Sequence, residues 1–206
     1  MTNFASKIAM ARSGANDAIG DLLEPYRNYM RMLAASQIGR PVGKRVSPSD
    51  IVQDTMLAAH RDIGDFHGTT QAEFGSWLRT VLSRCLLRAI EFNVKAEKRD
   101  VRREVSFDTI QSSLESSCAG MGNFLAHYQA SPSQIVSGEE ESLRMADYLA
   151  TLSEDYQKVI ALRNFGGMRF DEIATLMNRS PQAVRLLWLR AINRLRAIYF
   201  AGSRSS

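Results

Sequence analysis

Apolar residues recur at spacings of three and four along most of the 206 residues of the chain, which is the period of amphipathic helices. In the amino-terminal half this pattern predicts helices over residues 16–37, 47–64 and 74–99. The second begins with Ser47 as a helix cap and Pro48 at the first helical position. Strand signals are scarce, because β-branched residues are scattered and alternation with period two is brief. The sequence therefore predicts an all-α fold.

The helical period fades over residues 106–138, SFDTIQSSLESSCAGMGNFLAHYQASPSQIVSG, which are rich in Ser, Gly and other small residues. It resumes over 139–206, where punctuation around Leu152 and at Gly166 divides the segment into about four helices. The sequence therefore predicts two small helical domains, residues 1–105 and 139–206, joined by a flexible linker over 106–138.

Charge is segregated along the chain, although the net charge is only +4 and the sequence pI about 9.3. From Arg79 to Arg103 there are eight Lys or Arg against three acids, whereas from Glu104 to Leu143 there are six acids and no Lys or Arg. A basic block also closes the chain. Two basic blocks around an acidic middle suggest two modules that bind a polyanion, joined by a segment with a different role.

The carboxy-terminal basic block is a helix over residues 180–199, SPQAVRLLWLRAINRLRAIY, with Ser180 as its cap. One apolar stripe along it comprises Val184, Leu187, Ala191, Leu195 and Ile198. The arginines lie mostly off that stripe, at Arg185, Arg190, Arg194 and Arg196. Since no carboxylate occurs between residues 173 and 206, these arginines have no ion-pair partner at helical spacing. A solvated basic face is one interpretation, and a surface for an external polyanion is the other.

A short apolar helix and a tight turn precede this helix, with the spacing of a helix-turn-helix. Ala174 would let the two helices approach closely, and Val184 would be the facing apolar anchor. Residues predicted to meet DNA base edges are Ser180, Gln182, Arg185, Leu186 and Leu189. Arg190 and Arg194 are predicted to meet phosphates. The alternative is a helical hairpin with a solvated basic side.

Catalytic and metal-binding patterns are absent from the sequence. His60, His67 and His127 have unrelated spacing, and Cys85 and Cys118 belong to no metal-ligand motif. There is no phosphate-binding loop and no nucleophile elbow. The prediction is a protein that is not an enzyme and uses no cofactor or metal. The amino terminus has no signal-peptide core and no stretch reaches a membrane span, so a soluble cytoplasmic protein without membrane insertion is expected.

Two runs of sequence resemble a known family. SPSDIVQDTMLAAHRDIGDFHGTTQAEFGSWLRTVL resembles region 2 of bacterial sigma-70 family sigma factors, and LSEDYQKVIALRNFGGMRFDEIATLMNRSPQAVRLLWLRAINRLR resembles their region 4. The order is the same, and a linker replaces region 3, as in the extracytoplasmic-function (ECF) group. The resemblance implies a factor that binds core RNA polymerase and directs promoter recognition, DNA melting and transcription initiation. A free-standing helix-turn-helix regulator with a helical sensor or dimerisation domain is the alternative.

The resemblance also assigns roles to single residues. Asp50, Gln53 and Asp54 would contact the β′ clamp helices of the polymerase. The alternative is that these side chains are only solvated, or that Asp50 only caps its helix. The loop over residues 65–72 would capture the melted minus-ten element, which needs apolar surfaces and cations. Residues assigned to that task are Phe66, His67, Arg79, Arg84 and Arg88.

Neighbouring residues and segments receive different expectations. Phe74, Trp77 and Leu78 are predicted to lie in the core, given their three- and four-residue spacing. By resemblance, region 4 would read the minus-thirty-five element and dock on the polymerase β flap. The linker would pass through the active-site cleft, or act only as a disordered tether. An anti-sigma factor is a further candidate partner.

Overall fold

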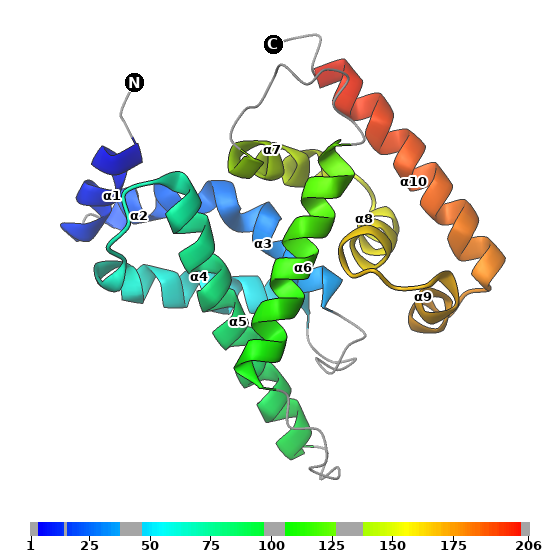
Figure 1. The fold of residues 1–206 in the computed structure, drawn as a ribbon, viewed down its shortest axis with the longest axis horizontal. Helices are drawn as coiled ribbons and strands as arrows, with labels where there is room; N and C mark the ends of the chain where they lie inside the picture. The colour runs from blue at the N-terminus through cyan, green and yellow to red at the C-terminus, as the bar shows by residue number, and fades with distance from the viewer. Residues whose placement is uncertain (1–3, 15, 38–46, 97–105, 127–137, 203–206) are drawn as a thin grey trace.

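The computed structural model describes residues 4–14, 16–37, 47–96, 106–126 and 138–202. All regular secondary structure in these ranges is helical, which confirms the predicted fold class (Figure 1). The helices of the amino-terminal part are α1 (Phe4–Arg12), α2 (Asn16–Leu23), η1 (Glu24–Tyr26), α3 (Arg27–Ser36), α4 (Pro48–Asp62), η2 (Ile63–Asp65) and α5 (Gln71–Ala96). They are followed by α6 (Phe107–Ala126), α7 (Gly138–Ala150), α8 (Glu154–Ile160), η3 (Ala161–Phe165), α9 (Phe170–Met177) and α10 (Pro181–Gly202).

Local signals explain most helix starts and breaks. The Ser47 hydroxyl accepts a hydrogen bond from the Ser49 N–H at 3.2 Å, so α4 begins at the predicted cap. The helix predicted over 16–37 is instead three pieces, α2, η1 and α3, because Pro25 has no N–H to continue the hydrogen-bond ladder. The helix α1 was not predicted from the sequence.

The predicted flexible linker is wrong for residues 107–126, because they form the 20-residue helix α6. Its buried positions keep a helical period, namely Ile110, Leu114, Ser117, Met121 and Phe124. Serine takes the place of an apolar residue in that stripe, which hides the period in the sequence. The Ser117 hydroxyl is fully buried 3.0 Å from the Ser36 hydroxyl of α3. The small residues of α6 therefore serve close helix packing.

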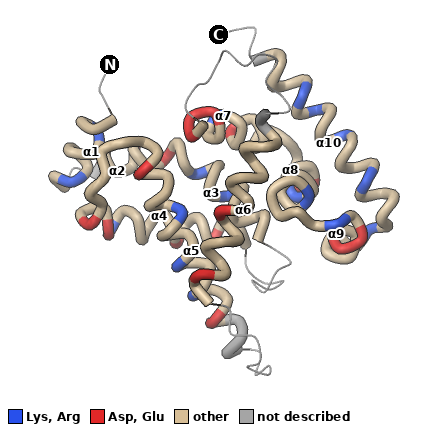
Figure 2. Tube along the Cα trace, in the orientation of Figure 1, with Lys and Arg blue, Asp and Glu red and all other residues tan. Residues whose placement is uncertain are grey.

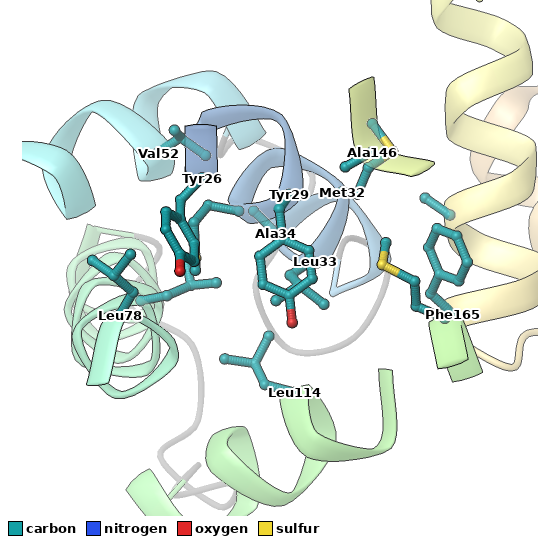
Figure 3. Packing of buried hydrophobic residues seen from close by; sticks show 14 of the residues in the cluster. Tyr26, Tyr29, Met32, Leu33, Ala34, Val52, Leu78, Leu114, Ala146 and Phe165 are labelled. Carbon is teal, nitrogen blue, oxygen red and sulfur yellow. The ribbon is translucent and has the colours of Figure 1, made fainter. Parts of the chain in front are cut away.

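The helix α3 is the centre of a core that both halves of the chain share. It packs against α4, and it also contacts α7 and η3 from the carboxy-terminal half. Figure 3 shows Tyr29, Met32 and Leu33 of α3 between Leu114 of α6 on one side and Ala146 and Phe165 on another. In this conformation the two predicted domains are joined by apolar packing as well as by the chain.

Candidate nucleic-acid interface

The predicted helix-turn-helix is formed by α9 and α10 (Figure 1). The turn depends on Asn178, which adopts a left-handed conformation with φ of 52° that asparagine tolerates better than most residues. The Arg179 N–H then returns to the Ala174 carbonyl at 3.0 Å. Ala174 and Val184 are both buried where the two helices meet, as their pattern predicts. The turn and the packed pair fix how α10 projects from the body.

The outward face of α10 carries the residues that were predicted to meet DNA. All of them are exposed: Ser180, Gln182, Arg185, Leu186, Leu189, Arg190 and Arg194. Leu186 is 54% exposed and Leu189 is 45% exposed, so two apolar side chains lie among the cations. The Ser180 hydroxyl accepts a hydrogen bond from the Ala183 N–H at 3.2 Å and thus also caps the helix.

Figure 2 shows basic residues but no acidic residue along α10. Among the residues that the structure describes, neither Arg190 nor Arg194 takes part in an ion pair. The nearby acids of α9 are engaged elsewhere, since Asp171 pairs with the Arg169 side chain and Glu172 accepts from the Arg169 N–H. The face is therefore electropositive and open to a polyanion.

Arg185 is held by an aromatic ring, which the sequence did not reveal. Its guanidinium carbon lies 5.4 Å from the centre of the Phe170 ring, and that of Arg163 lies 4.7 Å from the same centre. Trp188 meets Phe170 edge to face at 5.7 Å and donates its indole N–H to Asn164 at 2.9 Å. A guanidinium that packs on a ring keeps its N–H donors for other acceptors, so Arg185 is ordered and still able to bind.

Arg84 and Arg88 form a second basic face, one turn apart on α5. Both side chains are exposed, as predicted for phosphate contacts. The pKa of the nearby Asp62 carboxyl is lowered, chiefly by its hydrogen bond with Arg61 and further by the charges of Arg84 and Arg88. Phe92, one further turn along, is also exposed and was not singled out from the sequence. This face is cationic with an aromatic at its end.

Arg79 differs from the prediction, because its side chain turns inward and is only 21% exposed. It donates to the Tyr29 hydroxyl at 3.2 Å and pairs at 3.3 Å with Glu139 of α7, whose side chain is 13% exposed. Gly75 on α5 leaves room for this carboxylate, since a Cβ there would lie 1.8 Å from a Glu139 carboxylate oxygen and would displace the Glu139 side chain. In this conformation Arg79 joins the two halves of the chain and does not offer its charge to DNA.

Burial makes the Arg79–Glu139 pair costly. It raises the pKa of the Glu139 carboxyl, and the charge and hydrogen bond of Arg79 lower that pKa by less. For Glu139, desolvation therefore outweighs the gain from pairing, whereas the pKa of Arg79, which burial alone would lower, is raised by Tyr29 and Glu139. The pair is weak as a source of stability, but losing only one partner would leave a charge without compensation.

The loop between η2 and α5 rests on an aromatic cluster. Phe66 is only 4% exposed, with its ring centre 5.3 Å from that of Phe74 and 5.4 Å from that of Trp77. Its ring is buried in this conformation and supports from below the loop that it was predicted to shape. Phe74 and Leu78 are fully buried and Trp77 is partly buried, as predicted. His67 is exposed on the loop.

The residues predicted to contact polymerase lie on α4. Asp50, Gln53 and Asp54 are all exposed within its first two turns. Leu57, one turn after Gln53 and Asp54, is an exposed large apolar residue that the sequence reasoning did not include. The face combines two carboxylates, an amide and a leucine, a mixture suited to another protein surface.

Within the described ranges, no group of three or more His, Cys, Asp or Glu side chains could hold a metal ion. Cys85 and Cys118 are both free thiols. No helix of the described chain has the length and apolar character needed to cross a bilayer.

Fold and site together define a helix-turn-helix protein with a cationic second helix. The family model described as "Sigma-70, region 4" matches residues 142–195, which run from α7 into α10. This match, together with similar proteins that are named sigma factors, supports an ECF sigma factor of the sigma-70 family.

Similar proteins that match most of the chain include two that are named sigma factors. The chain is 25% identical over 181 residues to the RNA polymerase sigma-H factor of Bacillus licheniformis, covering 86% of this chain and 78% of that protein. It is 24% identical over 184 residues to the ECF RNA polymerase sigma-E factor of Haemophilus influenzae, covering 89% and 88%. A solved structure of CnrH in complex with the cytosolic domain of CnrY is 23% identical, with 96% and 97% covered and a TM-score of 0.35.

Proposed function

We propose that this sigma factor binds core RNA polymerase and reads promoters through two separate cationic faces, one on α10 and one on α5. The observation that carries the proposal is the helix-turn-helix, because its second helix presents exposed arginines, of which Arg190 and Arg194 take part in no ion pair among the described residues. The polymerase supplies catalysis, and this chain supplies promoter recognition.

The α10 face reads duplex DNA at the minus-thirty-five element. Its residues fall into those that reach base edges, Ser180, Gln182, Arg185, Leu186 and Leu189, and those that bind phosphates, Arg190 and Arg194. Leu186 and Leu189 would contact apolar groups such as thymine methyls. Arg185 is the strongest candidate for specificity, because Phe170 holds it in place before DNA arrives.

The α5 face and the loop over residues 65–72 hold the melted minus-ten element. Arg84 and Arg88 bind its phosphates, and His67 lies at the capture loop. Phe66 shapes the loop from beneath it. Arg79 can join them only if its contact with Glu139 is broken, so promoter binding through Arg79 needs the two halves to separate.

The polymerase contacts are proposed at two places. The α4 face with Asp50, Gln53 and Asp54 binds the β′ clamp helices, and region 4 docks on the β flap. The functional units are residues 1–105 and 139–206, with 106–138 between them as the connector. Such a factor acts in the cytoplasm with the polymerase, and an anti-sigma factor is a further candidate partner.

Run-off transcription tests the proposal. Purified chain is added to core RNA polymerase with genomic DNA templates, and the transcript starts are mapped. We expect starts that depend on the chain and share two upstream sequence elements. A variant with Asp50, Gln53 and Asp54 all changed to Ala is the matched test, since it should lose polymerase binding without unfolding. Tight binding to a palindromic duplex without polymerase would instead favour a free-standing regulator.

A further inference from the structure

The first helix of the chain, α1, packs as a fixed part of the fold. Ile8 and Ala11 are buried in the common core. The Phe4 ring meets the Phe74 ring edge to face, with centres 5.9 Å apart, and Phe74 in turn contacts Phe66. The helix thus ends at a defined place against η2 and the loop after it, and the last residue of α1 is Arg12.

Arg12 binds the backbone of that loop. Its guanidinium donates hydrogen bonds to the carbonyl oxygens of Phe66 and Gly68, the second at 3.2 Å. The guanidinium carbon also lies 5.5 Å from the centre of the Phe66 ring. One side chain from residue 12 therefore ties together two peptide units and a ring more than fifty positions along the chain.

The other side of the loop is held from α5 and η1. The Glu73 carboxylate accepts from the N–H groups of Thr69 at 2.9 Å and Thr70 at 3.0 Å. The Tyr26 hydroxyl donates to the Gln71 carbonyl at 3.3 Å. At Gly68 a Cβ would lie 2.5 Å from the Phe66 ring and 2.9 Å from Glu73 Cβ, so only glycine fits between them.

Arg12 also supplies positive charge where the loop has no Lys or Arg of its own. Residues 65–72, DFHGTTQA, contain one acid and no Lys or Arg. A surface that captures a single strand gains affinity from a backbone shape formed in advance and from cations beside the phosphates. Arg12 holds the backbone shape of the loop through its two carbonyl contacts. Because it is exposed, it also places a cation beside the loop.

We propose that Arg12 is a positioning residue, which braces the loop 65–72 in the shape that accepts single-stranded promoter DNA. This inference rests on the proposed function of the loop. It assigns the amino-terminal helix a role in holding melted DNA, separate from the polymerase contacts of α4 and the duplex contacts of α10.

The first experiment measures the loop in the free chain, with no DNA or polymerase. Amide hydrogen exchange is compared for the wild type, Arg12→Ala and Lys7→Ala. Lys7→Ala is the matched control, because Lys7 is an exposed cation of the same helix. Arg12→Ala should speed exchange of the amides of residues 66–71 by about fivefold, the loss expected for contacts of this kind, and leave α10 unchanged. Equal exchange in all three proteins would overturn the bracing role.

The second experiment measures DNA binding by holoenzyme. The probe is a fluorescent oligonucleotide of the non-template strand that spans the minus-ten element of a promoter mapped by run-off transcription. Arg12→Ala should weaken probe binding by about tenfold, while Lys7→Ala and binding of minus-thirty-five duplex stay within about twofold of wild type. Arg12→Lys should recover only part of the loss, because an ammonium cannot bridge two carbonyls and pack on the ring.

The outcomes separate the two proposals. Full recovery by Arg12→Lys, or an equal loss in Lys7→Ala, would mean that charge alone matters and would overturn the positioning role. Wild-type holoenzyme that binds no probe and starts no transcript would refute the proposed function. The exchange measurement would still decide in that case whether Arg12 braces the loop.

Discussion

The helices α5 and α10 are both rich in arginine, yet the fold uses their cations differently. On α5, Arg79 is turned inward and paired with Glu139 from the other half of the chain. On α10, Arg190 and Arg194 have no ion-pair partner among the described residues, and Arg185 lies on the Phe170 ring. The number of arginines in a helix therefore does not tell how many can bind a polyanion, because partners from distant segments can occupy them.

The two helices also differ in the acidic residues near them. The sequence from 173 to 206 has no acid, so α10 has no carboxylate at helical spacing. The first turn of α7 carries Glu139, Glu140 and Glu141, and the first of these reaches α5 at Gly75. Of the arginines of α5, Arg79 is thus covered by the half of the molecule that carries α10, while Arg84 and Arg88 stay exposed.

The largest effect is expected from breaking the contact that covers α5. Arg79→Ala should lower the free energy of unfolding by about 3 kcal/mol, because Glu139 would keep a mostly buried charge without a partner. Glu139→Gln should lower it by less, about 1–2 kcal/mol, because Arg79 loses its charged partner but can still donate to the amide oxygen and to the Tyr29 hydroxyl. Urea unfolding of both variants measures the difference.

The control for this pair is Arg27→Ala, which breaks the exposed ion pair of Arg27 with Glu24. Its expected loss is only about 0.5 kcal/mol, because solvent screens such pairs. Equal losses for Arg79→Ala and Arg27→Ala would mean that the contact between the halves is no tighter than a surface pair.

A smaller effect is expected on α10, and it concerns DNA and not stability. Arg185→Ala should weaken holoenzyme binding to a mapped promoter by about 1–3 kcal/mol and relax preference at one base pair. Arg190→Ala should weaken all sequences alike, because phosphate contacts carry no base information. Binding to promoter duplexes with each base pair changed in turn separates the two. Unchanged preference in Arg185→Ala would refute the placement of α10 in the groove.

The smallest effect is expected on the salt dependence of promoter binding through the arginines of α5. Arg84→Ala and Arg88→Ala should each reduce the salt dependence of promoter binding by about one phosphate contact. The plot of log affinity against log salt measures this slope. If Arg79→Ala also reduces it, the contact with Glu139 opens in the promoter complex. If Arg79→Ala leaves the slope unchanged, the halves stay joined around Arg79 when DNA binds.

Local rules predicted the parts of the molecule that are formed by neighbours in sequence. Ser47 and Pro48 marked the start of α4, and Val184 was correctly assigned to the buried side of the helix-turn-helix. The helix α6 was missed, because the buried Ser117 takes an apolar place in its stripe and its hydrogen-bond partner Ser36 lies in α3. A segment rich in Ser and Gly can be a closely packed helix, as here, or a flexible linker, and composition alone does not distinguish the two.

The remaining differences concern contacts between distant segments. Phe170 lies under Arg185, Glu139 lies on Arg79, and Arg12 lies on the loop of Gly68, each pair from separate helices or from a helix and a loop. None of these pairs has a spacing that a pattern could show. Each was formed when the helices packed.

The amino-acid order was sufficient for the helical class, the helix-turn-helix and the resemblance to sigma factors, because helical period, caps and turn residues act over a few positions. The assembly of the helices decided the rest. It determined which arginines can bind DNA, that Phe66 is buried, and that Arg12 contacts the loop 65–72. Burial and pairing are properties of the space around a side chain, and that space is built by residues that the chain brings together from far apart.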